Sequence, residues 1–96
     1  MGDVSREARV QLNASGWTEL AERDTTRVKL FVQNQEAAGG INVLIRFSAT
    51  DPGASATTGL ILHPEATLVD SPACVSAAWG RSASGTPYVW VHEETP

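Results

Sequence analysis

Regular alternation of apolar and polar residues is the feature of this chain that most limits how it can fold. Every second position is apolar in residues 27–34, and residues 41–47 and 88–93 repeat the pattern. Successive side chains of an extended chain point to opposite faces, so a period of two is typical of a half-buried β-strand. Together with the short apolar segment 59–63, these faces define the expected core: Val28, Leu30, Val32, Val43, Ile45, Phe47, Leu60, Leu62, Val89 and Val91.

A short polar link joins the first two of these segments. It covers residues 35–40 and ends in the pair Gly39-Gly40. Glycine adopts positive φ without a steric penalty, and a glycine pair after a short polar link is a hairpin signal. We therefore predict that residues 27–34 and 41–47 pair directly as a β-hairpin.

Other short segments complete an all-β pattern. Residues 17–22 fit either a strand or one helical turn, and their thin apolar stripe favours a strand. Residues 48–58 and 80–87 are expected to be loops, and the small-residue content of the first predicts that it is mobile. Residues 1–5 are expected to form a flexible N-terminal arm. Turn signals about every 8–12 residues predict one domain over 6–96, an antiparallel β-sandwich or small barrel of about seven strands. The remaining strands are expected at 8–12, 67–69 and 74–79.

Composition excludes several classes of partner. The 96 residues suit a single domain, and 42% of them are hydrophobic, which is enough for one core. The chain has seven basic and 11 acidic residues, which gives a net charge of −4. Nucleic-acid binding needs clustered Lys and Arg. No apolar run approaches the length of a membrane span, and residues 1–5 do not resemble a signal peptide. We expect neither nucleic acid nor membrane as a partner.

Residues that could carry chemistry are few and scattered. His63 and His92 are the only histidines, and Cys74 is the only cysteine, which excludes an intrachain disulfide. Neither metal-ligand spacing nor a phosphate-binding glycine loop nor a G-x-S-x-G elbow is present. Cys74 reads as a small buried residue. The sequence therefore predicts no catalytic residue, no metal and no cofactor, so the protein is expected not to be an enzyme.

Tryptophan and arginine supply the best candidates for a partner interface. Trp17, Trp79 and Trp90 suit either core or protein-interface packing, and a sugar-stacking platform is the alternative. Arginine and tryptophan are common interface anchors, and several lie in or near the first third of the chain. The candidate interface residues are Arg9, Trp17, Arg23 and Arg27. For Trp17 the alternative interpretation is that it packs in the protein's own core.

The strand endings form a pattern that runs roughly over residues 27–93. The pattern reads Arg27-x-x-Leu30-x-Val32-x-Asn34, Val43-x-Ile45-Arg46-Phe47, Gly59-x-x-Leu62-x-Pro64 and Val89-Trp90-Val91-x-Glu93. It resembles small β-rich virion proteins of tailed bacteriophages, among them capsid decoration, or cement, proteins. Where that pattern would have Pro-Gly, this chain has Pro64-Glu65, so a different turn is expected there and no contact residues are carried over.

The resemblance implies a function in assembly. The expected role is that of a capsid decoration protein that binds the major capsid protein on the outer shell, stabilises it and acts as a homo-oligomer, a dimer or trimer. Its place would be the virion, assembled in the host cytoplasm. The alternative is a β-sandwich binding module for host attachment or carbohydrate, on a tail or head fibre.

Overall fold

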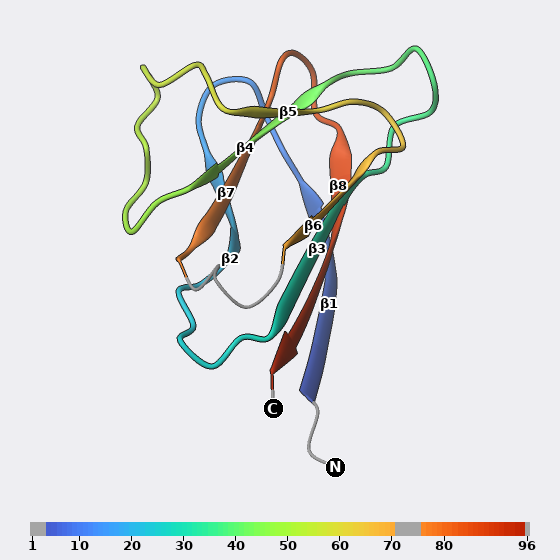
Figure 1. Cartoon of the computed structure of the whole chain (residues 1–96). Coiled ribbons are helices and arrows are strands. Elements are labelled where there is room, and N and C mark those ends of the chain that lie inside the picture. Colours follow the sequence, from blue (N-terminus) through green and yellow to red (C-terminus); the bar gives the residue numbers. More distant parts are fainter. Residues whose placement is uncertain (1–3, 71–75, 96) are drawn as a thin grey trace.

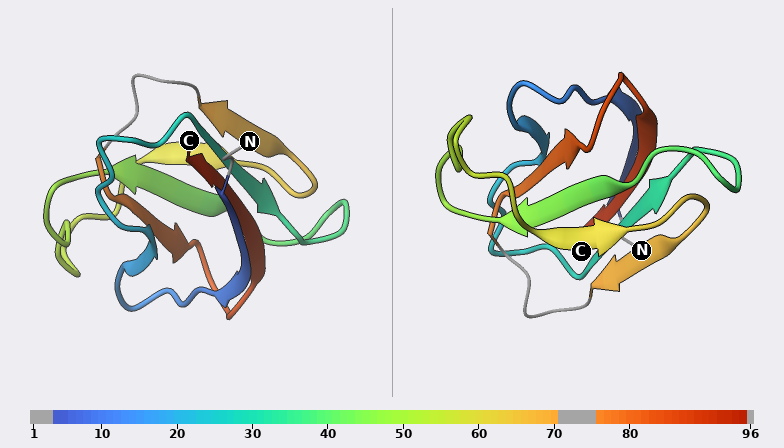
Figure 2. Two further views of the ribbon diagram at one scale, coloured as in Figure 1. Left: turned by 90° about the horizontal axis from the view of Figure 1, so that it is seen from below. Right: turned by 90° about the horizontal axis from the view of Figure 1, so that it is seen from above.

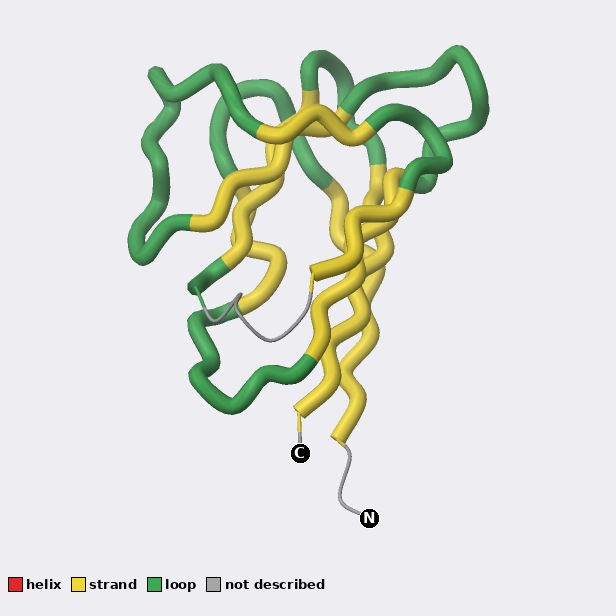
Figure 3. Tube along the Cα trace, viewed as in Figure 1, coloured by secondary structure: helices red, strands yellow, loops and turns green. Residues whose placement is uncertain are grey.

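The described residues of the protein form two antiparallel sheets of four strands each. The computed structural model describes residues 4–70 and 76–95, and Figures 1 and 3 show strands joined by loops, with no helix in the described part. None of the described residues belongs to a helix that could span a membrane. The strands are β1 (Val4–Gln11), β2 (Thr18–Ala21), β3 (Lys29–Asn34), β4 (Val43–Phe47), β5 (Leu60–Leu62), β6 (Thr67–Asp70), β7 (Ala78–Ser82) and β8 (Tyr88–Thr95).

The strand order is that of a jelly roll. One sheet runs β1-β8-β3-β6 and the other β2-β7-β4-β5. The pairs β1·β8, β2·β7, β3·β6 and β4·β5 are therefore nested along the chain and alternate between the sheets, which is the double Greek key of that architecture. Figure 2 shows the two layers from both ends. The prediction of an all-β antiparallel sandwich is confirmed, with eight strands where about seven were expected.

The predicted hairpin between the two central strands is wrong. β3 pairs with β6 and β8, whereas β4 pairs with β5 and β7 in the other sheet, so residues 35–42 cross the sandwich. At the crossing, Asn34 Nδ2 donates to the carbonyl oxygens of Ile41 and Leu62, both at 2.9 Å. An alternating strand buries one face whether its neighbour lies beside it or across the core. Alternation alone therefore does not distinguish a hairpin from a crossing.

The ends of three predicted elements also differ from the structure. Val4 and Ser5, expected in a flexible arm, belong to β1 and pair with Thr95 and Glu94. β7 begins later than predicted and includes Gly80, which was expected in a loop. A Cβ at that position would lie 3.1 Å from the side chains of Leu12 and Leu20, so glycine lets two core leucines pack against the strand. Cys74 lies outside the described residues, whereas the strand preference at residues 17–22 is confirmed by β2.

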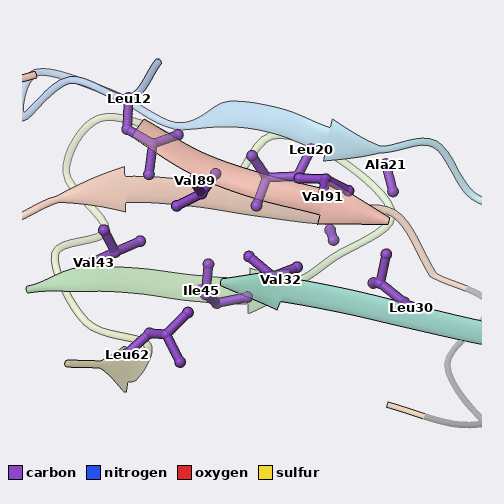
Figure 4. Close-up of a cluster of buried hydrophobic side chains, with 11 residues drawn as sticks. Leu12, Leu20, Ala21, Leu30, Val32, Val43, Ile45, Leu62, Val89 and Val91 are labelled. Atoms are coloured by element: carbon purple, nitrogen blue, oxygen red, sulfur yellow. The ribbon is translucent and has the colours of Figure 1, made fainter. Parts of the chain in front are cut away.

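Side chains from both sheets meet in one core, drawn in Figure 4. The buried residues include most of the predicted set: Leu30, Val32, Val43, Ile45, Leu62, Val89 and Val91. Phe47 packs against this core while partly buried. Val28 and Leu60 were wrongly predicted to be buried. Val28 comes just before β3, at the end of the sandwich where buried Arg27 and Glu93 lie, and Leu60 is 54% exposed on an edge strand. The prediction missed Leu12, Leu20, Ala21 and Ala78, whose segments show little alternation.

The turn after β5 keeps the geometry that glycine would give it. The N–H of Ala66 donates to the carbonyl oxygen of His63 at 3.0 Å, with Pro64 and Glu65 as the central residues. Glu65 has a φ of 69°, in the left-handed region that a type II turn requires at its third residue. Glu65 therefore bears a strain that glycine would avoid.

We predict that the core depends on Ile45 far more than on Leu60. Ile45 is fully buried, so Ile45→Ala should lower the free energy of unfolding by about 2–5 kcal/mol. Leu60→Ala, a matched control on the neighbouring strand, should cost about 1 kcal/mol or less because the side chain is exposed. Urea unfolding of the two variants measures both values, and equal losses would contradict the described packing.

Candidate interaction face

A long loop lies over part of the outer side of the β2-β7-β4-β5 sheet, while Ile61 on β5 stays 59% exposed. Residues 48–59 are held there by Trp79 of β7, whose Nε1 donates to Ser48 O at 3.0 Å, and by Trp17, just before β2, whose Nε1 donates to Ala56 O at 2.9 Å. Arg81 Nη1 also donates to Ala54 O, at 2.6 Å. The loop that was expected to be mobile is thus anchored by hydrogen bonds, and two of the three tryptophans donate them.

The outer side of the β1-β8-β3-β6 sheet carries a different surface, which we call the open face. Trp90, on the inner strand β8, is 37% exposed, and Val69, on the edge strand β6, is 58% exposed. Large apolar side chains on a sheet face in contact with water are typical of binding surfaces. The outward residues are Glu7, Arg9 and Gln11 of β1, Tyr88, Trp90 and His92 of β8, Lys29, Phe31 and Gln33 of β3, and Thr67 and Val69 of β6.

Strand register arranges the open face in rows. Trp90 lies directly between Arg9 on β1 and Gln33 on β3. The Arg9 guanidinium stacks on the neighbouring Tyr88 ring, 3.8 Å from its centroid, a cation–π contact that holds the arginine flat against the sheet. Aromatic rings and arginine dominate binding energy at protein interfaces. This row therefore presents ordered anchors for a partner.

His92 occupies the next row and bridges two carboxylates. Its Nδ1 lies 3.0 Å from Glu7 Oε1 and its Nε2 lies 3.0 Å from Glu94 Oε2. The edge of Phe31 packs against the same ring, with centroids 5.5 Å apart. The hydrogen bonds to Glu94 and then to Glu7 raise the pKa of His92 above its ordinary 6.5. Only the doubly protonated ring can donate to both carboxylates at once.

Charged side chains replace the apolar core at one end of the sandwich. Arg27 is 3% exposed, and its Nε donates to Glu93 Oε2 at 2.9 Å. Its other nitrogens donate to the carbonyl oxygens of Ser76, at 3.1 Å, and of Glu22. Arg6 completes the group: its Nε donates to Glu93 Oε1 at 2.7 Å.

A cavity of about 410 Å³ lies beside this charged group. Its lining mixes both signs of charge and belongs mostly to the segment from β2 towards β3: Arg6, Glu19, Leu20, Ala21, Glu22, Arg23, Asp24 and Glu93. Within residues 4–70 and 76–95, no three of the His, Cys, Asp and Glu side chains gather closely enough to hold a metal ion. We therefore assign no chemistry to this cavity.

The four residues proposed from the sequence do not gather at one place. Arg9 lies on the open face, and Arg23 lines the charged cavity. Trp17 and Arg27 are buried, Trp17 against the loop and Arg27 against Glu93, so neither offers surface to a partner in this structure. The alternative interpretation of Trp17 as a packing residue fits its position. The sequence proposal missed Tyr88. It left core packing, interface packing and sugar stacking open for Trp90 without placing it among the four, although Trp90 alternates with buried Val89 and Val91.

We predict that the ion pair of Glu93 with the buried Arg27 stabilises the protein far more than its ion pair with the exposed Arg6 does. Glu93→Ala leaves the buried Arg27 guanidinium without a counter-charge, which should cost about 3–5 kcal/mol. Arg6→Ala, the control, removes a side chain that is 50% exposed and should cost about 1 kcal/mol or less. Thermal or urea unfolding of both variants tests this, and similar losses would show that burial does not set the strength of the pair.

We predict that the stability of the protein falls as the pH rises through the pKa of His92. Folding raises that pKa above 6.5, so the stabilisation is complete below pH 6.5 and is lost as the pH passes the folded value. Unfolding measured between about pH 6 and pH 8 should show this slope in the wild type and less of it in His92→Gln. His63→Gln is the control, because the His63 ring contacts the amide oxygen of Asn42 and no carboxylate. An unchanged slope in His92→Gln would remove His92 as its source.

Comparison with known proteins adds no relative from which a function could be transferred. No protein-family model matches the chain, and no curated protein matches it either. The function must therefore be inferred from the arrangement of the chain's own residues. One sheet face is partly covered by an anchored loop, and the other presents stacked aromatic and arginine side chains.

Proposed function

We propose that the protein is a structural component of a tailed-bacteriophage virion, a capsid decoration protein that docks its open face on the major capsid protein. The observation that carries this proposal is the group of Trp90, Arg9 and Tyr88 on a sheet face where Trp90 is exposed and Arg9 stacks on Tyr88. These are the residue types that anchor protein interfaces, and here they are pre-ordered by stacking and strand register.

The pattern of strand endings supports the proposal in a specific way. Its first and last charged residues, Arg27 and Glu93, form the buried ion pair, and Asn34 holds the crossing between the sheets. The pattern thus describes contacts that maintain the fold. The architecture that these contacts maintain, the jelly roll, is common in viral capsid proteins as well as in lectins. Because fold does not imply function, the open face carries the functional part of the proposal.

A second candidate is saccharide binding during host attachment. The observation that favours it is the exposed Trp90 indole flanked by the Arg9 guanidinium and the Gln33 amide. A sugar ring can stack on an indole while such neighbours bond its hydroxyl groups. The cavity that Gln33 helps to line, about 320 Å³, is bounded otherwise by residues 34–37 and Glu65 and by neither Trp90 nor Arg9. The exposed indole therefore lies outside that hollow, which favours a protein surface over a small sugar.

Binding to capsids tests the proposal. Purified protein should co-sediment with undecorated capsids of the phage that encodes it, and Trp90→Ala should weaken binding about 30-fold, the effect of losing a hot-spot residue of about 2 kcal/mol. Ile61→Ala is the matched control, because Ile61 is an apolar residue 59% exposed on the other sheet. If the wild-type protein does not bind capsids but binds a glycan array in a way that depends on Trp90, the attachment hypothesis replaces the decoration hypothesis. Equal binding by both variants would remove the open face as the docking surface.

A further inference from the structure

The four edge strands of the sandwich differ in how well they are protected from pairing with another chain. β5 has three residues and β6 has four, while β2 has four and contains a shift of register between Glu19 and Ala21. Short strands and bulges are common means of blocking edge-to-edge association. β1 has neither: it is eight residues long and pairs with β8 in unbroken register. Among the described edges, β1 is therefore the one suited to accept a further strand.

We propose that β1 binds β1 of a second copy of this chain, antiparallel and about a twofold axis at Ala8. The two β1-β8-β3-β6 sheets then form one continuous eight-stranded sheet. Such an interface is self-complementary, as a twofold dimer requires. Each strand supplies the backbone donors and acceptors that its own sheet leaves unpaired on that side.

The outward charges of β1 select this register. With the axis at Ala8, Glu7 lies directly opposite Arg9 of the partner subunit, and Arg9 lies opposite Glu7 of the partner subunit. An axis at Glu7 or at Arg9 would instead place like charges opposite each other, which is unfavourable for a cross-strand pair. An axis between two residues would set outward side chains against inward ones. The sequence of the edge is therefore complementary to itself at one position.

Glu7 is already placed for this contact, whereas the Arg9 guanidinium, which stacks on Tyr88 of its own β8, must turn toward the edge of the sheet to make it. Glu7 uses Oε1 for His92 and its side chain is 53% exposed, so Oε2 can accept a hydrogen bond from the partner's Arg9. The same pairing extends the rows of the open face across the axis. In one such row, Trp90 is followed by Arg9 of the same copy and then by Glu7 of the partner subunit. This last point rests on the proposed function: two open faces on one surface would bind a capsid more tightly than either alone.

A charge-swap series tests the pairing in solution, without capsids. Sedimentation equilibrium of the wild type should show a monomer–dimer equilibrium, and Glu7→Arg or Arg9→Glu should each raise the dimer dissociation constant at least tenfold. The double variant E7R/R9E should restore it, because the opposite charges meet again with their positions exchanged. Lys29→Glu, an equal charge change on β3 of the same face, is the control and should leave dimerisation unchanged. A wild type that stays monomeric at all concentrations overturns the proposal, as does a double variant no better than the single ones.

Cross-linking provides a second readout that does not depend on charge. In a Cys74→Ser background, Ala8→Cys places two thiols beside the twofold axis, and mild oxidation should give a disulfide-linked dimer. Thr67→Cys on β6, the opposite edge of the same sheet, should not. Rapid cross-linking through position 67 and none through position 8 would contradict pairing through β1. Because neither experiment includes capsids, failure of this proposal leaves capsid docking untouched, and failure of docking leaves this one untouched.

Discussion

The ion pair between Arg27 and Glu93 is the contact on which the arrangement of the strands depends most. It joins the residue before β3 to the end of β8, while the remaining nitrogens of Arg27 bind backbone oxygens of Glu22 and Ser76. Arg6 brings β1 to the same carboxylate and also donates to the carbonyl oxygen of Leu20. Burying a charge is costly unless its partners satisfy it. Here every buried polar side-chain atom in the described residues has a hydrogen-bond partner.

The hydrogen-bonded group of Arg6, Arg27 and Glu93 explains how a small sandwich can be long and narrow at one end. In Figure 1, β1, β3 and β8 continue towards the chain ends beyond the level of β2. The apolar core, drawn in Figure 4, fills the middle of the sandwich, and the charged group takes over beyond it. The network holds strands together where few apolar side chains are present to do so. Arg6 ties β1 to this network, and the unbroken register of β1 with β8 brings Arg9 beside Trp90.

The two outer faces show how similar residues can serve different purposes in one fold. On one sheet, Trp79 and Arg81 of β7 and Trp17 just before β2 donate their side-chain hydrogen bonds to carbonyl oxygens of the loop. Trp90 and Arg9 project from the other sheet and meet solvent. The loop thus occupies the tryptophans of the first face, although Ile61 on β5 remains exposed there. The difference between the faces directs the functional proposal to the open one, and it separates packing tryptophans from an available one.

The sequence by itself determined the fold class, most of the strands and most of the core, because side-chain alternation is a local property of an extended chain. It also placed Tyr88, Trp90 and His92 on one side of their strand. What only the tertiary structure decided was which strand lies beside which. Two alternating strands joined by a short link look the same whether they pair or cross the core, so β3 and β4 were assigned to one sheet. The burial of Trp17 and Arg27 was equally hidden, because each depends on a partner far along the chain, Ala56 for one and Glu93 for the other. Local pattern specifies what a residue can do in a strand, whereas long-range contacts decide whether it is left free to do it.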